Sequence, residues 1–253
     1  MKLKFDNKPS DDFVLTVKNL HKSFGGVLAI NDLNIEVQKQ KITGLIGPNG
    51  SGKTTTFSII SGLTMLDSGE ITFNGELITH LKPYQISNRG LLRTFQLTRV
   101  FPKMTVLENL TVRDGFRKAI KDQLMWELIE IVGLANNLSD MAGTLSFGQQ
   151  KLLELVRAAC RKPVVMLLDE PFAGVNETME RNLVGFIRHL QNEQHCSFVL
   201  IDHEMRLVME LCDHIYVMSN GYLIFQGSPL EVQNDPATRD AYFGKGTIGA
   251  SVN

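Results

Sequence analysis

The fold is decided by the stretch Gly47-Pro48-Asn49-Gly50-Ser51-Gly52-Lys53-Thr54, which matches the pattern G-x-x-x-x-G-K-[ST] without departure. A short apolar run at residues 42–46 precedes it, and a helix-compatible run at residues 54–60 follows it. Glycines let backbone N–H groups wrap around phosphates, and the N-terminus of the following helix adds a positive partial charge. The stretch therefore predicts a phosphate-binding loop between a strand and a helix.

The end of this loop carries a charged group and hydroxyl groups. Lys53 supplies a point charge for the β- and γ-phosphates of a nucleotide, and the Thr54 hydroxyl is placed to ligate Mg²⁺. With Thr55, the candidate ATP-binding segment covers residues 47–55, and Mg²⁺ is the expected accompanying ion. The alternative is a glycine-rich turn with a chance Gly-Lys-Thr, which the flanking strand and helix disfavour.

A second element is a fully apolar run at residues 164–168 that ends in Asp169 and Glu170. Such a strand brings two carboxylates to the edge of a sheet where the phosphates would lie. We expect Asp169 to hold Mg²⁺, directly or through water, and Glu170 to orient and polarise the attacking water. Alone this pattern is usually just a strand end, and it gains its meaning from the phosphate loop.

A third element decides the family. The stretch Leu145-Ser146-Phe147-Gly148-Gln149-Gln150 opens a helix predicted to run to about residue 160, and Ser146 is a favourable N-cap. One interpretation is purely structural, with Ser146 capping the helix and Gly148 relieving crowding. However, Leu-Ser-x-Gly-Gln shortly before the strand at residues 164–168 resembles the ATP-binding subunit of ABC transporters. The resemblance covers about residues 13–244, with several motifs in the expected order.

The resemblance implies roles that the residues alone do not. Phe24 matches the aromatic residue that stacks on adenine, which is favoured over the alternative of a core phenylalanine at a strand end. Gln96 matches the glutamine that senses Mg²⁺ and the γ-phosphate, and His203 matches the histidine that contacts the γ-phosphate. The implied catalytic residues are Glu170, His203 and Gln96. The implied metal-binding residues are Thr54, Gln96 and Asp169.

The family works as a head-to-tail dimer, so the resemblance implies a second ATP-binding subunit, either identical or related. Each nucleotide would lie between Lys53 of one subunit and Ser146, Gly148 and Gln149 of the other. A helix N-terminus that meets the γ-phosphate of a partner makes physical sense of this arrangement. ATP would then hold the dimer together, and its hydrolysis would release it.

Two positions depart from the commonest pattern of the family. Phe147 replaces a glycine, and Asn176 stands where many members have Asp. Because Ser146, Gly148 and Gln149 remain, we expect γ-phosphate binding to survive. Gly174 and Asn176 are expected to keep a contact role at the subunit boundary, without acid/base chemistry.

The implied fold is α/β, a P-loop NTPase core with a mixed sheet, an N-terminal antiparallel β-subdomain and an inserted α-helical subdomain. We expect residues 1–253 to form a single ABC ATPase domain. Its core would cover about residues 13–96 and 161–230, its helical subdomain about 97–160, and its C-terminal tail about 231–253. Periodicity predicts strands at residues 13–17, 33–37, 42–46, 70–73, 164–168, 197–201, 215–218 and 222–225. It predicts helices at residues 54–60, 104–137, 146–160, 178–191 and 203–211.

Composition limits the function classes. Hydrophobic residues make up 43% of the chain and charged residues 21%, which suits a globular core. The 26 basic and 27 acidic residues give a formal net charge of −1, which argues against a nucleic-acid partner. No apolar run reaches the roughly 20 residues of a membrane span, and three cysteines without metal spacing indicate a reducing compartment. We therefore expect a cytoplasmic protein, peripheral on the inner face of the membrane, that contacts the membrane only through permease subunits.

The transported solute is predicted from weaker similarities. The stretches at residues 93–96, 100–102, 105–110, 145–150, 173–176, 234–237 and 241–244 resemble the subfamily that energises uptake of branched-chain and other hydrophobic amino acids. The stretch between Gln96 and Leu145 is shorter than that subfamily predicts. The motif at residues 172–175 is also similar to the lipopolysaccharide-export ATPase, which is one alternative. Others are a soluble ABC-type ATPase that acts on ribosomes or DNA, and a different P-loop enzyme such as a small-molecule kinase.

Overall fold

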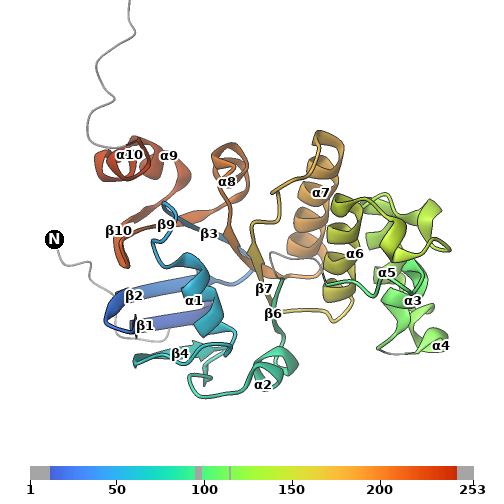
Figure 1. The fold of residues 1–253 in the computed structure, drawn as a ribbon, viewed down its shortest axis with the longest axis horizontal. Coiled ribbons are helices and arrows are strands. Elements are labelled where there is room, and N and C mark those ends of the chain that lie inside the picture. The colour runs from blue at the N-terminus through green and yellow to red at the C-terminus, as the bar shows by residue number, and fades with distance from the viewer. Residues whose placement is uncertain (1–11, 95–98, 114, 244–253) are drawn as a thin grey trace, which may run out of the picture.

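The computed structural model describes residues 12–94, 99–113 and 115–243, and Figure 1 shows their arrangement. Two sheets form the centre of the molecule. A four-stranded antiparallel sheet has the order β2-β1-β4-β5, and a six-stranded sheet has the order β10-β9-β3-β8-β7-β6. In the larger sheet β3, β6, β7, β8 and β9 pair in parallel, and β10 pairs antiparallel with β9. The predicted combination of a mixed core sheet and an N-terminal antiparallel sheet is confirmed.

The strands of the antiparallel sheet are β1 (Phe13–Phe24), β2 (Val27–Gln38), β4 (Ser68–Phe73) and β5 (Glu76–Leu77). The strands of the larger sheet are β3 (Ile42–Ile46), β6 (Leu91–Arg93), β7 (Val165–Asp169), β8 (Ser197–Ile201), β9 (His214–Ser219) and β10 (Tyr222–Gly227). The strand predictions are confirmed to within a few residues, except that β1 and β2 are much longer than their apolar stretches. β1 pairs with β2 on one side and with β4 on the other. Backbone hydrogen bonds to these strands therefore extend β1 beyond its apolar residues into the polar residues that follow.

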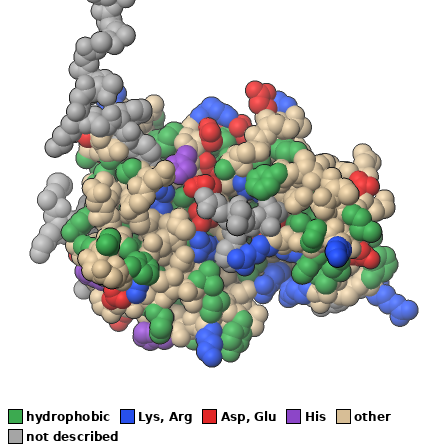
Figure 2. All heavy atoms as spheres, in the orientation of Figure 1, with side chains coloured by type: hydrophobic (Ala, Val, Ile, Leu, Met, Phe, Trp, Pro, Cys, Tyr) green, Lys and Arg blue, Asp and Glu red, His purple; other side chains and the backbone are tan. Residues whose placement is uncertain are grey.

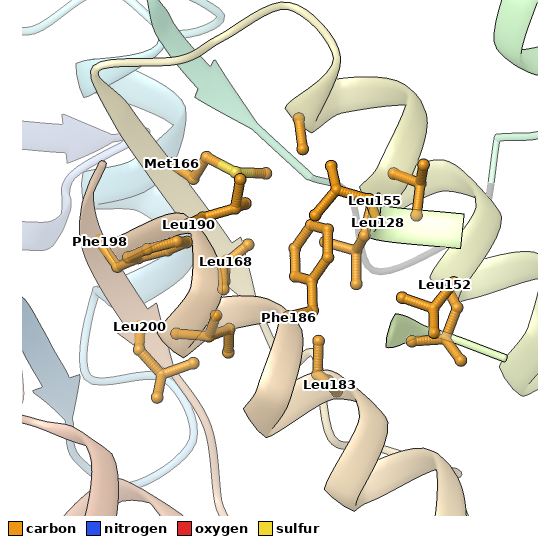
Figure 3. Close-up of a cluster of buried hydrophobic side chains, with 14 of the residues drawn as sticks. Leu128, Leu152, Leu155, Met166, Leu168, Leu183, Phe186, Leu190, Phe198 and Leu200 are labelled. Carbon is orange, nitrogen blue, oxygen red and sulfur yellow. The ribbon is translucent and has the colours of Figure 1, made fainter. Parts of the chain in front are cut away.

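The larger sheet is covered on both faces, which its alternating side chains show. On β7, Met166 and Leu168 join the core beneath the helices, while Val165 and Leu167 join the core shared with the antiparallel sheet. Figure 3 shows the first core, where side chains of β7 and β8 meet those of α5, α6 and α7. Both faces being apolar explains why these strands are continuously hydrophobic in sequence.

Helices α1 (Lys53–Ile60), α7 (Glu177–Glu193) and α8 (Met205–Leu211) follow strands β3, β7 and β8 in the chain. The predicted helix at residues 146–160 is confirmed as α6 (Phe147–Ala159), which packs beside α7. α8 begins two residues later than predicted, because the Asp202 carboxylate accepts hydrogen bonds from the backbone N–H groups of His203 and Glu204. Three further helices are α2 (Pro83–Asn88), α9 (Pro229–Asn234) and α10 (Pro236–Phe243), and the last two occupy the predicted tail.

The prediction of one helix over residues 104–137 is wrong. The structure divides this segment into α3 (Val106–Thr111), α4 (Phe116–Ala119), α5 (Gln123–Ile131) and a 3₁₀ turn at Ala135–Asn137. Gly115, between α3 and α4, has φ 76°, a left-handed conformation that interrupts a helix. Gly133 ends α5 as expected, with φ 71° and its N–H donating to the Glu130 carbonyl. Among the described residues, no helix has the length and apolar character needed to cross a membrane.

Candidate functional site

The phosphate loop joins β3 to α1, as the sequence predicts. Its backbone is one that side chains rarely allow, since Gly47, Gly50 and Gly52 have φ values of 151°, 78° and 107°. A Cβ atom at Gly47 would lie 2.1 Å from the Met218 carbonyl oxygen, and one at Gly52 would lie 2.6 Å from the Ala29 oxygen. Neighbouring backbone thus fits closely against the loop, which explains the glycines at these positions.

The ammonium group of Lys53 points back into the phosphate loop. Its buried Nζ donates to the carbonyl oxygens of Gly47 at 2.7 Å and Pro48 at 3.0 Å. Burial lowers the pKa of Lys53, while the nearby carboxylates of Glu170 and Asp169 raise it. The buried hydroxyl of Ser51 has no hydrogen-bond partner among the described residues. A buried cation held by loop carbonyls and an unpaired buried hydroxyl are groups that a bound phosphate would satisfy.

The remaining loop residues are more open. Asn49 and Thr54 are exposed, and Pro48 and Thr55 are partly buried. Thr54 therefore stands at the first turn of α1 with its side chain accessible to a ligand. The structure brings all of residues 47–55 to one end of the larger sheet, where β3 ends.

Asp169 ends β7 and is 2% exposed. Its Oδ2 atom accepts a hydrogen bond from the Arg93 guanidinium at 2.8 Å, and its Oδ1 atom has no partner among the described residues. A buried carboxylate oxygen without a donor is costly, and it is also a good ligand for Mg²⁺. The Oδ1 atom of Asp169 is therefore a suitable ligand for a divalent cation beside the phosphate loop.

Glu170 and His203, two of the predicted catalytic residues, lie together. Glu170 follows β7 and His203 follows β8, and these strands are parallel neighbours, so both residues emerge at the same edge. The His203 Nε2 atom lies 3.2 Å from the Glu170 Oε1 atom. Glu170 has φ 51°, and its N–H donates to the Ile201 carbonyl at 2.8 Å. A left-handed glutamate is uncommon, and such strained residues cluster at active sites.

Asp202 holds this edge in shape, a role that the sequence did not indicate. Its Oδ1 atom accepts from the backbone N–H groups of His203 at 2.7 Å and Glu204 at 3.0 Å. Its Oδ2 atom accepts from the N–H of Phe172 at 3.0 Å. One buried carboxylate thereby ties the segment after β8 to the segment after β7.

Lys151 is another residue that no motif in the sequence indicates, because it lies within the apolar stripe of α6. Its buried Nζ donates to the carbonyl oxygens of Glu170 at 2.7 Å and Ala173 at 3.0 Å. Burial lowers its pKa, and the carboxylates of Asp202, Glu170 and Glu154 oppose that shift. α6 is therefore joined directly to the backbone of Glu170. A charged residue on the buried stripe was the one available signal.

The N-terminus of α6 is satisfied within its own chain. Ser146 and Gln149 form a reciprocal cap, in which the Gln149 N–H donates to the Ser146 Oγ at 3.3 Å and the Ser146 N–H donates to the Gln149 Oε1 at 3.1 Å. A Cβ atom at Gly148 would lie 2.2 Å from the Met179 sulfur of α7. Both structural roles considered for Ser146 and Gly148 are thus present.

The two positions that depart from the family pattern lie beside this helix end. Phe147 is 49% exposed, and its ring is the nearest group to a Cβ built at Gly174, at 3.7 Å. Asn176 caps α7, since its Oδ1 atom accepts from the Met179 N–H at 2.9 Å. Asn176 therefore supplies in this chain the helix cap that Asp would also supply.

Two remaining predicted residues are less informative. Phe24 ends β1, is 49% exposed and has the Lys22 ammonium 5.1 Å from its ring centroid, so it is not the core residue of the alternative interpretation. Gln96 lies outside the described residues.

Near the middle of one face, acidic and basic side chains gather side by side (Figure 2).

A strand–glycine loop–helix unit with a buried lysine, next to strand ends that carry two carboxylates and a histidine, defines a P-loop nucleotide-binding ATPase. The family model described as "ABC transporter" matches residues 30–173. The chain belongs to the ABC transporter family, as an ATP-binding subunit that hydrolyses ATP.

Similar proteins support this assignment over nearly the whole chain. The chain is 35% identical to the high-affinity branched-chain amino acid transport ATP-binding protein BraF of Pseudomonas aeruginosa, over 92% of this chain and 98% of that protein. It is 36% identical to LivG of Escherichia coli, which has the same description, with the same coverage. It is 34% identical to the lipopolysaccharide export system ATP-binding protein LptB of Haemophilus influenzae, also over 92% and 98%.

Solved structures agree with the fold. A nucleotide-free ATP-binding cassette from an ABC transporter has a TM-score of 0.81 and 32% identity, over 92% of this chain and all of that one. The ADP conformation of the cassette MJ1267 has a TM-score of 0.81 and 31% identity, over 92% and 99%. The chain is therefore a nucleotide-binding domain.

Proposed function

We propose that this subunit binds Mg²⁺-ATP with residues 47–55 around the phosphates, and with Asp169, Thr54 and Gln96 around the metal. Bound there, Mg²⁺ would neutralise phosphate charge as the terminal phosphoryl group is transferred to water. The single observation that carries this proposal is the buried Oδ1 atom of Asp169, which has no hydrogen-bond partner within residues 12–94, 99–113 and 115–243. Burial lowers the pKa of Lys53, so its charged form is stabilised incompletely by the loop carbonyls to which its Nζ donates. This supports a lysine that exchanges those carbonyls for the phosphate oxygens of a bound nucleotide.

We propose that Glu170 polarises the attacking water and accepts its proton. His203, 3.2 Å from the carboxylate, holds Glu170 in place and meets the γ-phosphate. The backbone of Glu170 is fixed from two directions, by the Ile201 carbonyl and by the Lys151 ammonium. Such fixation supports a preorganised base, because catalysis depends on holding the carboxylate in one geometry.

A second ATP-binding subunit is proposed to complete each site with Ser146, Gly148 and Gln149. The support is that α6 has 13 residues, begins at an exposed Phe147, and has its cap confined to its own first turn. Its N-terminal N–H groups can therefore face a phosphate held by another copy. In the same arrangement Phe24 stacks on adenine, and Gly174 and Asn176 contact the partner.

Permease subunits are the proposed membrane partners, so the chain would lie in the cytoplasm on the inner face of the membrane. A cavity of about 440 Å³ is lined by residues of β6, α3 and α6 together with Phe101, which is 47% exposed. Its charged lining residues are Glu154 and the arginines Arg93, Arg99, Arg113, Arg157 and Arg161, of which Arg93 is already paired with Asp169. A groove between the core and the helical segment, apolar and with more basic than acidic side chains, suits a permease segment that carries apolar and acidic side chains.

The proposed transported solutes are branched-chain or other hydrophobic amino acids. The support is the similarity to BraF and LivG over nearly their whole lengths. A lipopolysaccharide-export role is the second candidate, supported by the similarity to LptB. The test is to reconstitute the subunit with its permease in proteoliposomes that contain ATP. Leucine uptake that depends on this subunit supports the first proposal, and ATP-driven extraction of lipopolysaccharide without leucine uptake supports the second.

A further inference from the structure

Arg93, the last residue of β6, makes an ion pair that the family assignment does not explain. Its side chain is 7% exposed and that of Asp169 is 2% exposed, so the pair is buried. One guanidinium nitrogen donates to Asp169 Oδ2 at 2.8 Å and another donates to Ser58 Oγ at 2.9 Å. The guanidinium also lies over the ring of Phe57, 5.8 Å from its centroid. Three contacts, one with β7 and two with α1, thus fix the planar group.

The pair leaves Asp169 with one oxygen available. Oδ2 is occupied by Arg93, while the buried Oδ1 has no partner among the described residues. The orientation of the carboxylate is therefore set by the guanidinium, and only one of its oxygens can turn to a cation. Lys53 is close enough for Asp169 to influence its charge state, so two cationic groups surround this carboxylate before any ligand binds.

Charge balance then decides when a metal can enter. A divalent cation that approaches Oδ1 without a nucleotide meets the positive charges of Arg93 and Lys53, which already compensate Asp169. Nucleotide phosphates reverse this balance, because they bring several negative charges to the same place.

We propose that Arg93 is a positioning residue that points one oxygen of Asp169 to the metal site and withholds that site from divalent cations until nucleotide phosphates arrive. This inference rests on the proposed role of Asp169 as a Mg²⁺ ligand. Metal and nucleotide consequently enter together, and the nucleotide-free subunit remains metal-free.

The experiment measures Mn²⁺ binding to the full chain by electron paramagnetic resonance, with and without ATP, since Mn²⁺ accepts the same oxygen ligands as Mg²⁺. Without ATP, Arg93→Met is expected to bind Mn²⁺ at least about 10-fold more tightly than the unmodified chain, because one repelling charge is gone. Mn²⁺ alone should also raise the unfolding temperature of Arg93→Met and not that of the unmodified chain. Arg188→Met is the matched control, because Arg188 contacts Gln191 and Glu210 and makes no contact with Asp169.

Two more variants keep the test decisive. Arg93→Gln is a second neutral variant that retains an amide donor, and it should behave like Arg93→Met. Arg93→Lys keeps the positive charge but loses the planar guanidinium that fixes the Asp169 carboxylate. This variant should therefore exclude Mn²⁺ without ATP, yet bind Mn²⁺ several-fold more weakly than the unmodified chain with ATP. Nucleotide-free Mn²⁺ affinity that is unchanged in folded neutral variants overturns the inference, and so does an Arg93→Lys variant indistinguishable from the unmodified chain. Failure of the unmodified chain to bind Mn²⁺ with ATP would instead refute the proposed role of Asp169.

Discussion

The phosphate loop and the N-terminus of α6 are built in opposite ways. At the loop end of the sheet, the Ser51 hydroxyl and one oxygen of Asp169 are buried and have no hydrogen-bond partner in the part of the chain that the structure describes, and Glu170 is held in a left-handed conformation. At the start of α6, Ser146 and Gln149 satisfy each other and Phe147 is exposed. One region is organised around a ligand that it still needs, and the other is complete and faces outward.

This difference indicates how the two halves of the proposed site are divided between subunits. Unpaired buried groups are tolerated where a ligand repays their cost, so the loop half must bind the nucleotide itself. A helix end that is already capped gains from an anion without needing one. It can therefore form stably in each subunit and meet the nucleotide only when a second subunit arrives.

The largest expected effect is on the loop half. Glu170→Gln should lower ATP turnover by about 10²–10⁴-fold, because the amide cannot accept the proton of the attacking water. ATP binding and ATP-dependent dimerisation should persist, since the residues around the phosphates are unchanged. Phosphate release and size-exclusion chromatography measure the two effects, and Glu210→Gln, on an exposed carboxylate, is the control. Near-normal steady-state hydrolysis by Glu170→Gln would contradict the role given to this residue.

The second prediction concerns the helix half alone. Ser146→Arg should prevent ATP-dependent dimerisation, because a long charged side chain would occupy the place of the partner's phosphate. Nucleotide binding by the monomer, followed with a fluorescent ATP analogue, should remain largely intact. Ser228→Arg makes the same change at the N-cap of α9, which has the same capping arrangement. Equal dimerisation by Ser146→Arg and the unmodified chain would count against a shared site.

The third prediction separates packing from ligand binding at the start of α6. Gly148→Ala should destabilise the fold by about 1–3 kcal/mol, because the new methyl group would collide with the Met179 sulfur. Thermal unfolding of Gly148→Ala, Met179→Ala and the double variant measures this effect. Removing the Met179 side chain should make the alanine at position 148 much less costly. Fully additive effects of the two substitutions would show that the collision does not matter.

The smallest effect concerns the caps themselves. Ser146→Ala and Ser228→Ala should each cost about 0.5–2 kcal/mol of stability, since each removes one reciprocal cap. Only Ser146→Ala should also weaken ATP-dependent dimerisation, by several-fold. Chemical denaturation and analytical ultracentrifugation give the two numbers. A matching loss of dimerisation in Ser228→Ala would mean that stability, and not position, controls assembly.

The sequence predicts best where structure is local. The phosphate loop, the strand that ends at Asp169 and the start of α6 all carry their signals within a few residues, and the structure places them as expected. The helix predicted over residues 104–137 failed because apolar periodicity continued across Gly115, whose backbone interrupts it. Local spacing does not reveal how the segment turns back on itself.

Contacts between residues far apart in the sequence could not be predicted, for a physical reason. Lys151 reaches the backbone after β7, and Arg93 reaches Asp169 across neighbouring strands, although neither residue has a motif. The Arg93 contact depends on the pairing of β6 with β7, and the Lys151 contact depends on the packing of α6 against the segment after β7. Charged residues in otherwise buried segments were the only available signal, and they do not identify their partners.

Complementation tests the division of the site between subunits most directly. Lys53→Ala disables the loop half and Ser146→Arg disables the helix half, so each variant alone should be inactive. Mixing them equally should restore up to about half of the unmodified ATPase rate, because each mixed dimer contains one of its two sites with both halves intact. A chain that carries both substitutions, mixed with either single variant, should restore nothing. No recovery in the first mixture would contradict a site shared between two copies of this chain.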